Sequence, residues 1–140
     1  DKKQMKEELQ GPKVTQAAVA VVEELNELGE SVFNVYLLNF YEVELEGVLV
    51  SSVGYAVHHE TQEQVKTSTL RHHLENVPPR SFKKIEPIIE DVFGLNNEYW
   101  VSFWMNDAMH DKKFIFLQET IKKDNFVQIP LINKPGVMIR

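Results

Sequence analysis

The feature that most limits the fold is a series of short runs, rich in β-branched and aromatic residues, that fills the chain after Gly29. The seven runs are residues 32–40, 46–57, 65–70, 82–88, 98–105, 113–121 and 126–131. Turn-forming residues separate them, as in Pro78-Pro79 and Gly94-Leu95-Asn96-Asn97. Short runs of this kind between regular turn signals are typical of an all-β sandwich or barrel. The sequence therefore predicts a mainly β fold of about seven strands.

One helix is expected before these strands, over residues 14–28. Apolar positions there recur at i, i+3, i+4 and i+7, which is the spacing of one helix face. Gly29 follows in the C′ position, where many helices end. Val19 and Ala20 widen the apolar surface, so this helix would need cover on more than one side.

The composition fits one self-sufficient domain. The chain has 140 residues, of which 43% are hydrophobic, enough to bury a single core without cross-links. Residues 1–12 are charged and end at Gly11-Pro12, which predicts a flexible leader before a globular domain over residues 13–140. The net charge of −6 argues against a protein that wraps duplex nucleic acid. The absence of cysteine excludes disulfides, thiol nucleophiles and cysteine-ligated zinc.

No targeting segment is expected within the sequence. No run approaches the ~20 apolar residues that a membrane-spanning helix needs. The first ten residues carry charges with no hydrophobic segment behind them, unlike a signal peptide. We expect a cytoplasmic location, with a periplasmic one as the alternative if an upstream signal was removed.

The segment 94–103 carries the most specific resemblance to known domains. Leu95 precedes by four residues Tyr99, which opens an alternating strand, as in a tyrosine corner. Over residues 32–121 the spacing resembles an immunoglobulin-like or fibronectin-III-like sandwich, although the Cys…Trp…Cys pattern of antibody domains is absent. The resemblance implies two antiparallel sheets, and we expect the helix to pack on an outer face. The alternatives are a Tyr99 hydroxyl in water and an α+β fold with one antiparallel sheet covered by the helix.

Two local patterns add detail to this fold. Pro87 makes the fourth run an edge strand or ends it early, because proline cannot donate a hydrogen bond to a neighbouring strand. Residues 133–136, Asn-Lys-Pro-Gly, are typical of a type II turn with proline at i+1 and glycine at i+2.

Several runs are apolar on both faces, which predicts a covered outer surface. If Tyr99 faces the core, the period of two places Trp100 and Trp104 on the opposite side of the strand. Each indole is able to bury on the order of 200 Å², so we expect something to cover the pair. The two covers that fit are the helix over residues 14–28 and a second copy of the chain in a homodimer.

Strands that are apolar on both faces carry more apolar residues than one core can bury, and this indicates an interaction surface. Its candidate residues are Trp100, Trp104, Phe126, Ile129 and Leu131. The sequence holds no complete catalytic motif. We therefore expect a non-enzymatic interaction or assembly domain that pairs with itself or another protein through a sheet face, an edge or the C-terminal arm. No cofactor, nucleic acid or membrane is expected as a ligand.

Histidines and carboxylates point to the alternative function. Alternate connections of a sandwich emerge at the same end, so His72 or His73 is expected near the turn that carries Asp107 and His110, with the pair at 58–59 at the opposite end. Imidazole and carboxylate together suit zinc, iron or nickel. The alternative is thus a small metal-binding protein or metalloenzyme, unless these are surface histidines in polar loops.

A hydroxyl-rich segment gives one further signal. Residues 67–69 carry three hydroxyls close to Arg71, a combination that suits an anion. The simpler interpretation is that these hydroxyls lie on the solvated face of an edge strand.

Overall fold

The computed structural model describes residues 12–57 and 60–140. Except for Pro12, the expected leader over residues 1–12 lies outside the described residues, as do His58 and His59. The described residues form ten strands and two 3-10 segments, and no α-helix occurs among them. The strands are β1 (Ala17–Leu25), β2 (Ser31–Asn39), β3 (Leu45–Val57), β4 (Gln64–Lys66), β5 (Leu70–Val77), β6 (Ser81–Ile88), β7 (Asn96–Met105), β8 (Ala108–Phe116), β9 (Val127–Ile129) and β10 (Lys134–Ile139). The 3-10 segments are η1 (Glu90–Val92) and η2 (Lys123–Asn125).

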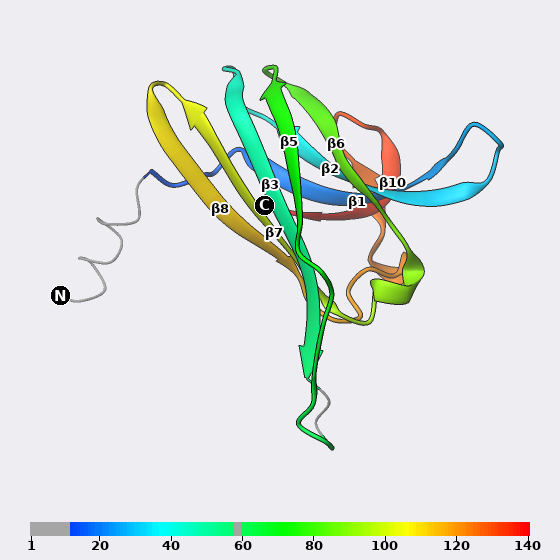
Figure 1. Ribbon diagram of the computed structural model, residues 1–140. Helices are drawn as coiled ribbons and strands as arrows, with labels where there is room; N and C mark the ends of the chain where they lie inside the picture. Colours follow the sequence, from blue (N-terminus) through cyan, green and yellow to red (C-terminus); the bar gives the residue numbers. More distant parts are fainter. Residues whose placement is uncertain (1–11, 58–59) are drawn as a thin grey trace.

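The strands form two antiparallel sheets, with one lying across the back of the other in Figure 1. The β1 sheet has the order β6-β2-β1-β10-β9. In the β3 sheet, β3 pairs with β7 on one side and with β4 and β5 on the other, and β8 follows β7. The predicted mainly β fold with two antiparallel sheets is confirmed, but the described residues form ten strands and not about seven, because segments 17–25, 70–77 and 134–139 are strands as well. As expected from Pro87, β6 lies at the edge of its sheet.

Alternating side chains build the core between the two sheets. The residues of β7 that face this core are Tyr99, Val101, Phe103 and Met105. Trp100 and Trp104 point to the other side of the sheet and remain exposed. The period of two that the sequence predicts for this strand is therefore confirmed.

The prediction of a helix over residues 14–28 is wrong, because most of this segment forms β1. Every residue from 17 to 22 is fully buried. Val19 and Val21 face the β3 sheet, whereas Ala18 and Ala20 face the opposite side. A continuous apolar run that is buried on both faces satisfies the helical spacing as well as the strand spacing, and periodicity alone cannot separate the two.

Gly29 lies in the turn that joins β1 to β2 and not at a helix terminus. Its φ of 80° is in the left-handed region that favours glycine. The Oδ1 atom of Asn26 accepts hydrogen bonds from the backbone N–H groups of Leu28 and Glu30, each at 2.9 Å. A positive φ serves such a turn as well as it serves a helix end, which explains the wrong prediction.

The outer face of the β1 sheet has a second core. Its buried residues are Ala18, Ala20, Val22, Leu38, Phe40, Ile129 and Ile132. The last two belong to the C-terminal hairpin, in which β9 pairs with β10 and β10 pairs with β1. The hairpin extends the β1 sheet, and its residues Ile129 and Ile132, rather than a helix, pack in the second core. The α+β alternative is wrong as well, because two sheets are present and the described residues contain no covering helix.

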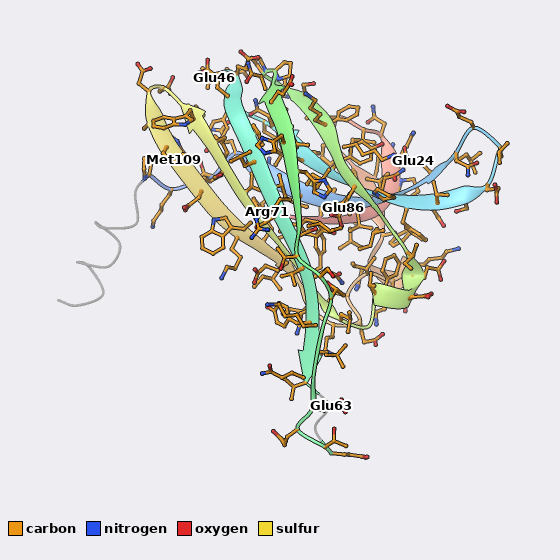
Figure 2. All side chains as sticks on the ribbon, in the orientation of Figure 1. Glu24, Glu46, Glu63, Arg71, Glu86 and Met109 are labelled. Carbon is orange, nitrogen blue, oxygen red and sulfur yellow. The ribbon has the colours of Figure 1, made fainter. Side chains whose placement is uncertain are left out.

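A largely buried carboxylate also joins three neighbouring strands of the β1 sheet. Glu24 of β1, which is labelled in Figure 2, accepts hydrogen bonds from three side chains: Asn34 at 2.5 Å, Tyr36 at 2.6 Å and Lys134 at 2.7 Å. Burial alone would raise the pKa of Glu24, but the bonds from Lys134, Tyr36 and Asn34 outweigh it and lower the pKa below its usual value. The carboxylate therefore links β1, β2 and β10.

The turn expected over residues 133–136 occurs earlier in the chain. Residues 130–133 connect β9 to β10, and the Asn133 N–H donates to the Ile129 carbonyl oxygen at 2.8 Å. Gly136 lies within β10 opposite Val22. A Cβ atom at Gly136 would overlap the Val21 carbonyl oxygen. Glycine is needed there because the β10 backbone passes close to β1 and leaves no room for a side chain.

Replacing Gly136 with alanine is expected to destabilise the fold, because the added Cβ would force β10 away from β1. We expect a loss of about 1–3 kcal/mol in the free energy of unfolding, the usual range for overpacking, measured by urea denaturation. Gly94→Ala is the matched control, since the nearest atom to its added Cβ is a side-chain oxygen of Glu119 at 3.4 Å. Equal stability of the two variants would contradict the close approach.

Candidate functional site

The outer face of the β3 sheet is the candidate functional site, and we name it the tryptophan face. The strand register places on it Glu46, Leu49, Ser51 and Val53 of β3, Arg71 and His73 of β5, Glu98, Trp100, Ser102 and Trp104 of β7, and Met109, Asp111, Lys113 and Ile115 of β8. Glu46, Arg71 and Met109 are labelled on these strands in Figure 2. Side chains of four strands therefore share one surface.

The two indoles are half exposed on this face. Trp100 is 45% exposed and Trp104 is 47% exposed. The Lys113 ammonium lies 4.8 Å from the centroid of the Trp100 ring, and it is 3.9 Å from Glu98. The helix that was expected to cover the indoles does not exist, and the C-terminal hairpin lies on the other sheet. Within the described residues, the tryptophan face has no cover.

A hollow in the tryptophan face lies beside Trp100. Its volume is about 310 Å³, and its lining includes Leu49, Ser51, Arg71, His73, Trp100 and Ser102. Ser51 pairs with Trp100 and Arg71 on its two sides, and Ser102 pairs with Leu49. The serines are small, so they leave space between the larger residues. We name this space the serine hollow.

The serine hollow presents hydrogen-bond donors beside an aromatic ring. Across residues 12–57 and 60–140, the side chains of Arg71 and His73 make no hydrogen bond or ion pair. A guanidinium binds a carboxylate through two parallel hydrogen bonds, and an indole adds apolar contact area. The hydroxyls that line the serine hollow with Arg71 belong to Ser51 and Ser102, and not to residues 67–69 as the sequence suggested. Thr67 instead accepts a hydrogen bond from the Gly54 N–H at 2.8 Å.

The predicted metal ligands do not come together. His72 and His73 lie in the middle of β5, and His110 lies on β8, with β3 and β7 between them. This separation is roughly 14 Å at three strand spacings. Asp107 is in the turn between β7 and β8. In the part of the chain that the structure describes, no three His, Asp or Glu residues are placed to hold a metal ion.

The reason is that residues 70–77 form a strand and not a connection. The turn before β6 and the turn between β7 and β8 do emerge at the same end of the fold, as Figure 1 shows. His72 lies in the first half of β5, away from the end of the strand that leads into this turn, and its Nε2 lies 2.8 Å from Glu86. His110 is buried, with its ring stacked on Phe103 at 5.4 Å and its Nδ1 2.9 Å from the Ala108 carbonyl oxygen.

The candidate interaction residues divide into two groups. Trp100 and Trp104 lie on the tryptophan face, whereas the three C-terminal residues pack inside the fold. Ile129 is fully buried in the second core, and Leu131 packs against that core. Phe126 makes an edge-on contact with Phe33, with ring centroids 6.3 Å apart. These three residues therefore stabilise the chain itself.

Tyr99 does not form the expected tyrosine corner, and its hydroxyl is not in water either. The residue is buried, and its hydroxyl donates to Glu86 at 3.3 Å. Asn97 makes the bonds to the upstream backbone, to the carbonyl oxygens of Val92 at 2.9 Å and Leu95 at 3.1 Å. Burial raises the pKa of Tyr99 far above its usual value, and the Glu86 carboxylate raises it further.

Comparisons with known proteins found no matching family model, no matching curated protein and no matching solved structure. In the described part of the chain, no helix has the length and apolar character needed to cross a membrane.

Both indoles are expected to be accessible to iodide in the isolated chain, because each is about half exposed and none of the described residues covers it. The chain has two tryptophans, so Trp100→Phe and Trp104→Phe each leave one emitter. Stern–Volmer quenching of each variant, compared with the same variant unfolded in urea, measures the accessibility. A tryptophan that resists iodide only in the folded chain would show that the tryptophan face is covered.

Stability is expected to fall as the pH rises above about 10, the pKa of an unfolded tyrosine. The folded state keeps the Tyr99 proton, because the pKa of Tyr99 is raised, so high pH favours the unfolded state. Between about pH 10 and 11, wild type should lose about 1 kcal/mol more than Tyr99→Phe in urea denaturation. Ser52→Ala removes another donor to Glu86 but no phenol, and should lose stability with pH as wild type does. Equal pH slopes for wild type and Tyr99→Phe would contradict this role.

Proposed function

We propose that this chain is a non-enzymatic interaction domain that binds an acidic segment of a partner protein through the tryptophan face. The observation that carries the proposal is the half exposure of Trp100 and Trp104 on a sheet face that no described residue covers. Tryptophan and arginine are the residues that most often dominate binding energy at protein interfaces. Here both types lie on one face, where Arg71 and Trp100 line the same hollow with Ser51 between them.

The size of the tryptophan face fits a protein partner. From Glu46 to Val57, β3 spans roughly 36 Å, and four strands side by side span roughly 19 Å. The product is roughly 700 Å², close to the roughly 800 Å² that each partner contributes to a standard interface. Leu49 and Met109 add exposed apolar area beside the indoles.

The basic residues at one flank of the tryptophan face favour an acidic partner segment there, whereas the acidic residues of this face, Glu46, Glu98 and Asp111, lie on β3, β7 and β8. The flank formed by β4 and β5 carries Lys66, Arg71 and His73 toward this face, opposite Tyr55, Ser51 and Leu49. An acidic segment would complete the hydrogen bonds of Arg71 in the serine hollow. The chain itself has a net charge of −6, so two copies would repel one another as they approached.

We also infer that the sandwich is immunoglobulin-like or fibronectin-III-like. The order β1-β2-β6 in one sheet corresponds to strands A, B and E of that architecture, and β3-β7-β8 in the other corresponds to C, F and G. β5 beside β3 corresponds to the added C′ strand of variable-type domains. The hairpin of β9 and β10 is an addition to this pattern.

Peptide selection tests the proposed function. A library of random peptides displayed on phage is selected on the full chain, and the enriched peptides should combine Asp or Glu with an aromatic or aliphatic residue. Calorimetry with the synthetic peptides should show binding at least about tenfold weaker, or ~1.4 kcal/mol, for Arg71→Glu and for Trp100→Ala. Lys122→Glu is the matched control, because it reverses an exposed charge outside the tryptophan face and should bind as wild type does.

Two results would overturn this function. Enriched peptides that bind Arg71→Glu and Trp100→Ala as tightly as wild type would show that the tryptophan face is not the binding surface. Sedimentation should show a monomer. If sedimentation instead shows a dimer, and Trp100→Ala dissociates it, the tryptophan face binds a second copy of the chain.

A further inference from the structure

A second concave site lies between the two sheets, where β3, β6 and β7 meet near η1, on the side of β3 opposite to the serine hollow. The cavity has a volume of about 310 Å³, and its lining includes Ser52, Leu70, Glu86, Ile89, Val92 and Tyr99. Glu86 projects from β6 next to β5 (Figure 2). We name this space the glutamate cavity. Nothing in the proposed function uses it.

Glu86 is the only charged residue that lines the glutamate cavity among the described residues. Its side chain is 12% exposed. One carboxylate oxygen, Oε1, accepts the Ser52 hydroxyl at 2.5 Å and lies 2.8 Å from His72 Nε2. The other oxygen, Oε2, has a single long bond from the Tyr99 hydroxyl at 3.3 Å. A carboxylate oxygen is able to accept two hydrogen bonds, so Oε2 has acceptor capacity left.

The mouth of the cavity is apolar. Leu70 is 50% exposed and Ile89 is 63% exposed, and both line the cavity. Pro87 and Val92 add further apolar surface. A carboxylate behind an apolar entrance matches a ligand with an aliphatic stem and a positively charged end, the form in which lysine side chains usually pack.

From this geometry we propose that the glutamate cavity binds a primary ammonium group on an aliphatic stem. The ammonium donates to Glu86 Oε2, and the stem packs between Leu70 and Ile89. Charge-assisted hydrogen bonds of this kind are roughly twice as strong as neutral ones, and they favour an ammonium over a hydroxyl of the same shape. A free alkylamine and a lysine side chain of another protein share this chemistry.

Titration of the isotope-labelled full chain with n-hexylamine tests the site. Amide signals of lining residues, such as Gly54, Ser68 and Val92, should shift and saturate, while n-hexanol and hexanoate should leave them unchanged. N-acetyl-lysine N-methylamide forms the second arm. Shifts with both amines assign the site to lysine side chains, and shifts with hexylamine alone assign it to small amines.

Two variants distinguish the contribution of the Glu86 carboxylate to amine binding from the contribution of the cavity's shape. Glu86→Gln should bind hexylamine at least about tenfold more weakly. Because Glu86 also holds Ser52 and Tyr99, Ile89→Lys serves as the second variant, placing a competing ammonium at an exposed mouth position. Glu98→Gln on the tryptophan face is the matched control and should bind as wild type does. Equal binding of hexanol and hexylamine, or undiminished binding by a folded Glu86→Gln or Ile89→Lys, would overturn the proposal.

Discussion

The burial of β1 on both faces is the constraint on which the rest of the fold depends. Residues 17–22 have no contact with solvent, and strand side chains alternate, so each side of the sheet needs its own cover. The β3 sheet covers Val19 and Val21, and the C-terminal hairpin packs in the same core as Ala18 and Ala20. Because that hairpin belongs to the β1 sheet, no segment within residues 12–57 and 60–140 covers the tryptophan face.

Much of the fold could be predicted because its signals are local. Short β-branched and aromatic runs specify strands, and the alternation in β7 placed Tyr99 inside and Trp100 outside. The segment at 14–28 could not be predicted in this way, because its central apolar run fits both the helical and the strand period. What decides between them is the presence of a partner on each side, and those partners come from residues far along the chain.

The candidate sites also combine features that the local sequence determines with features that depend on residues far along the chain. The outward direction of Trp100 depends on its own strand and was predictable, whereas the serine hollow depends on the register that sets Ser51 between Trp100 and Arg71. No local pattern encodes that register. Glu86 is a lone carboxylate within a strand, and its hydrogen-bond partners come from β3, β5 and β7, so nothing in the sequence near it gives a signal.

The pairing of β1 with β10 has a consequence for how the domain folds. Val19 pairs with Ile139, so a strand near the start of the sequence gains its second neighbour only from residues near the end. Closing so long a loop costs chain entropy before the contacts compensate for it, and domains of such high contact order fold slowly. During synthesis, β1 would leave the ribosome long before β10 and Ile129 do. Until they arrive, Ala18, Ala20 and Val22 form an open apolar stripe, which makes this interval the one in which the nascent chain is most exposed to aggregation.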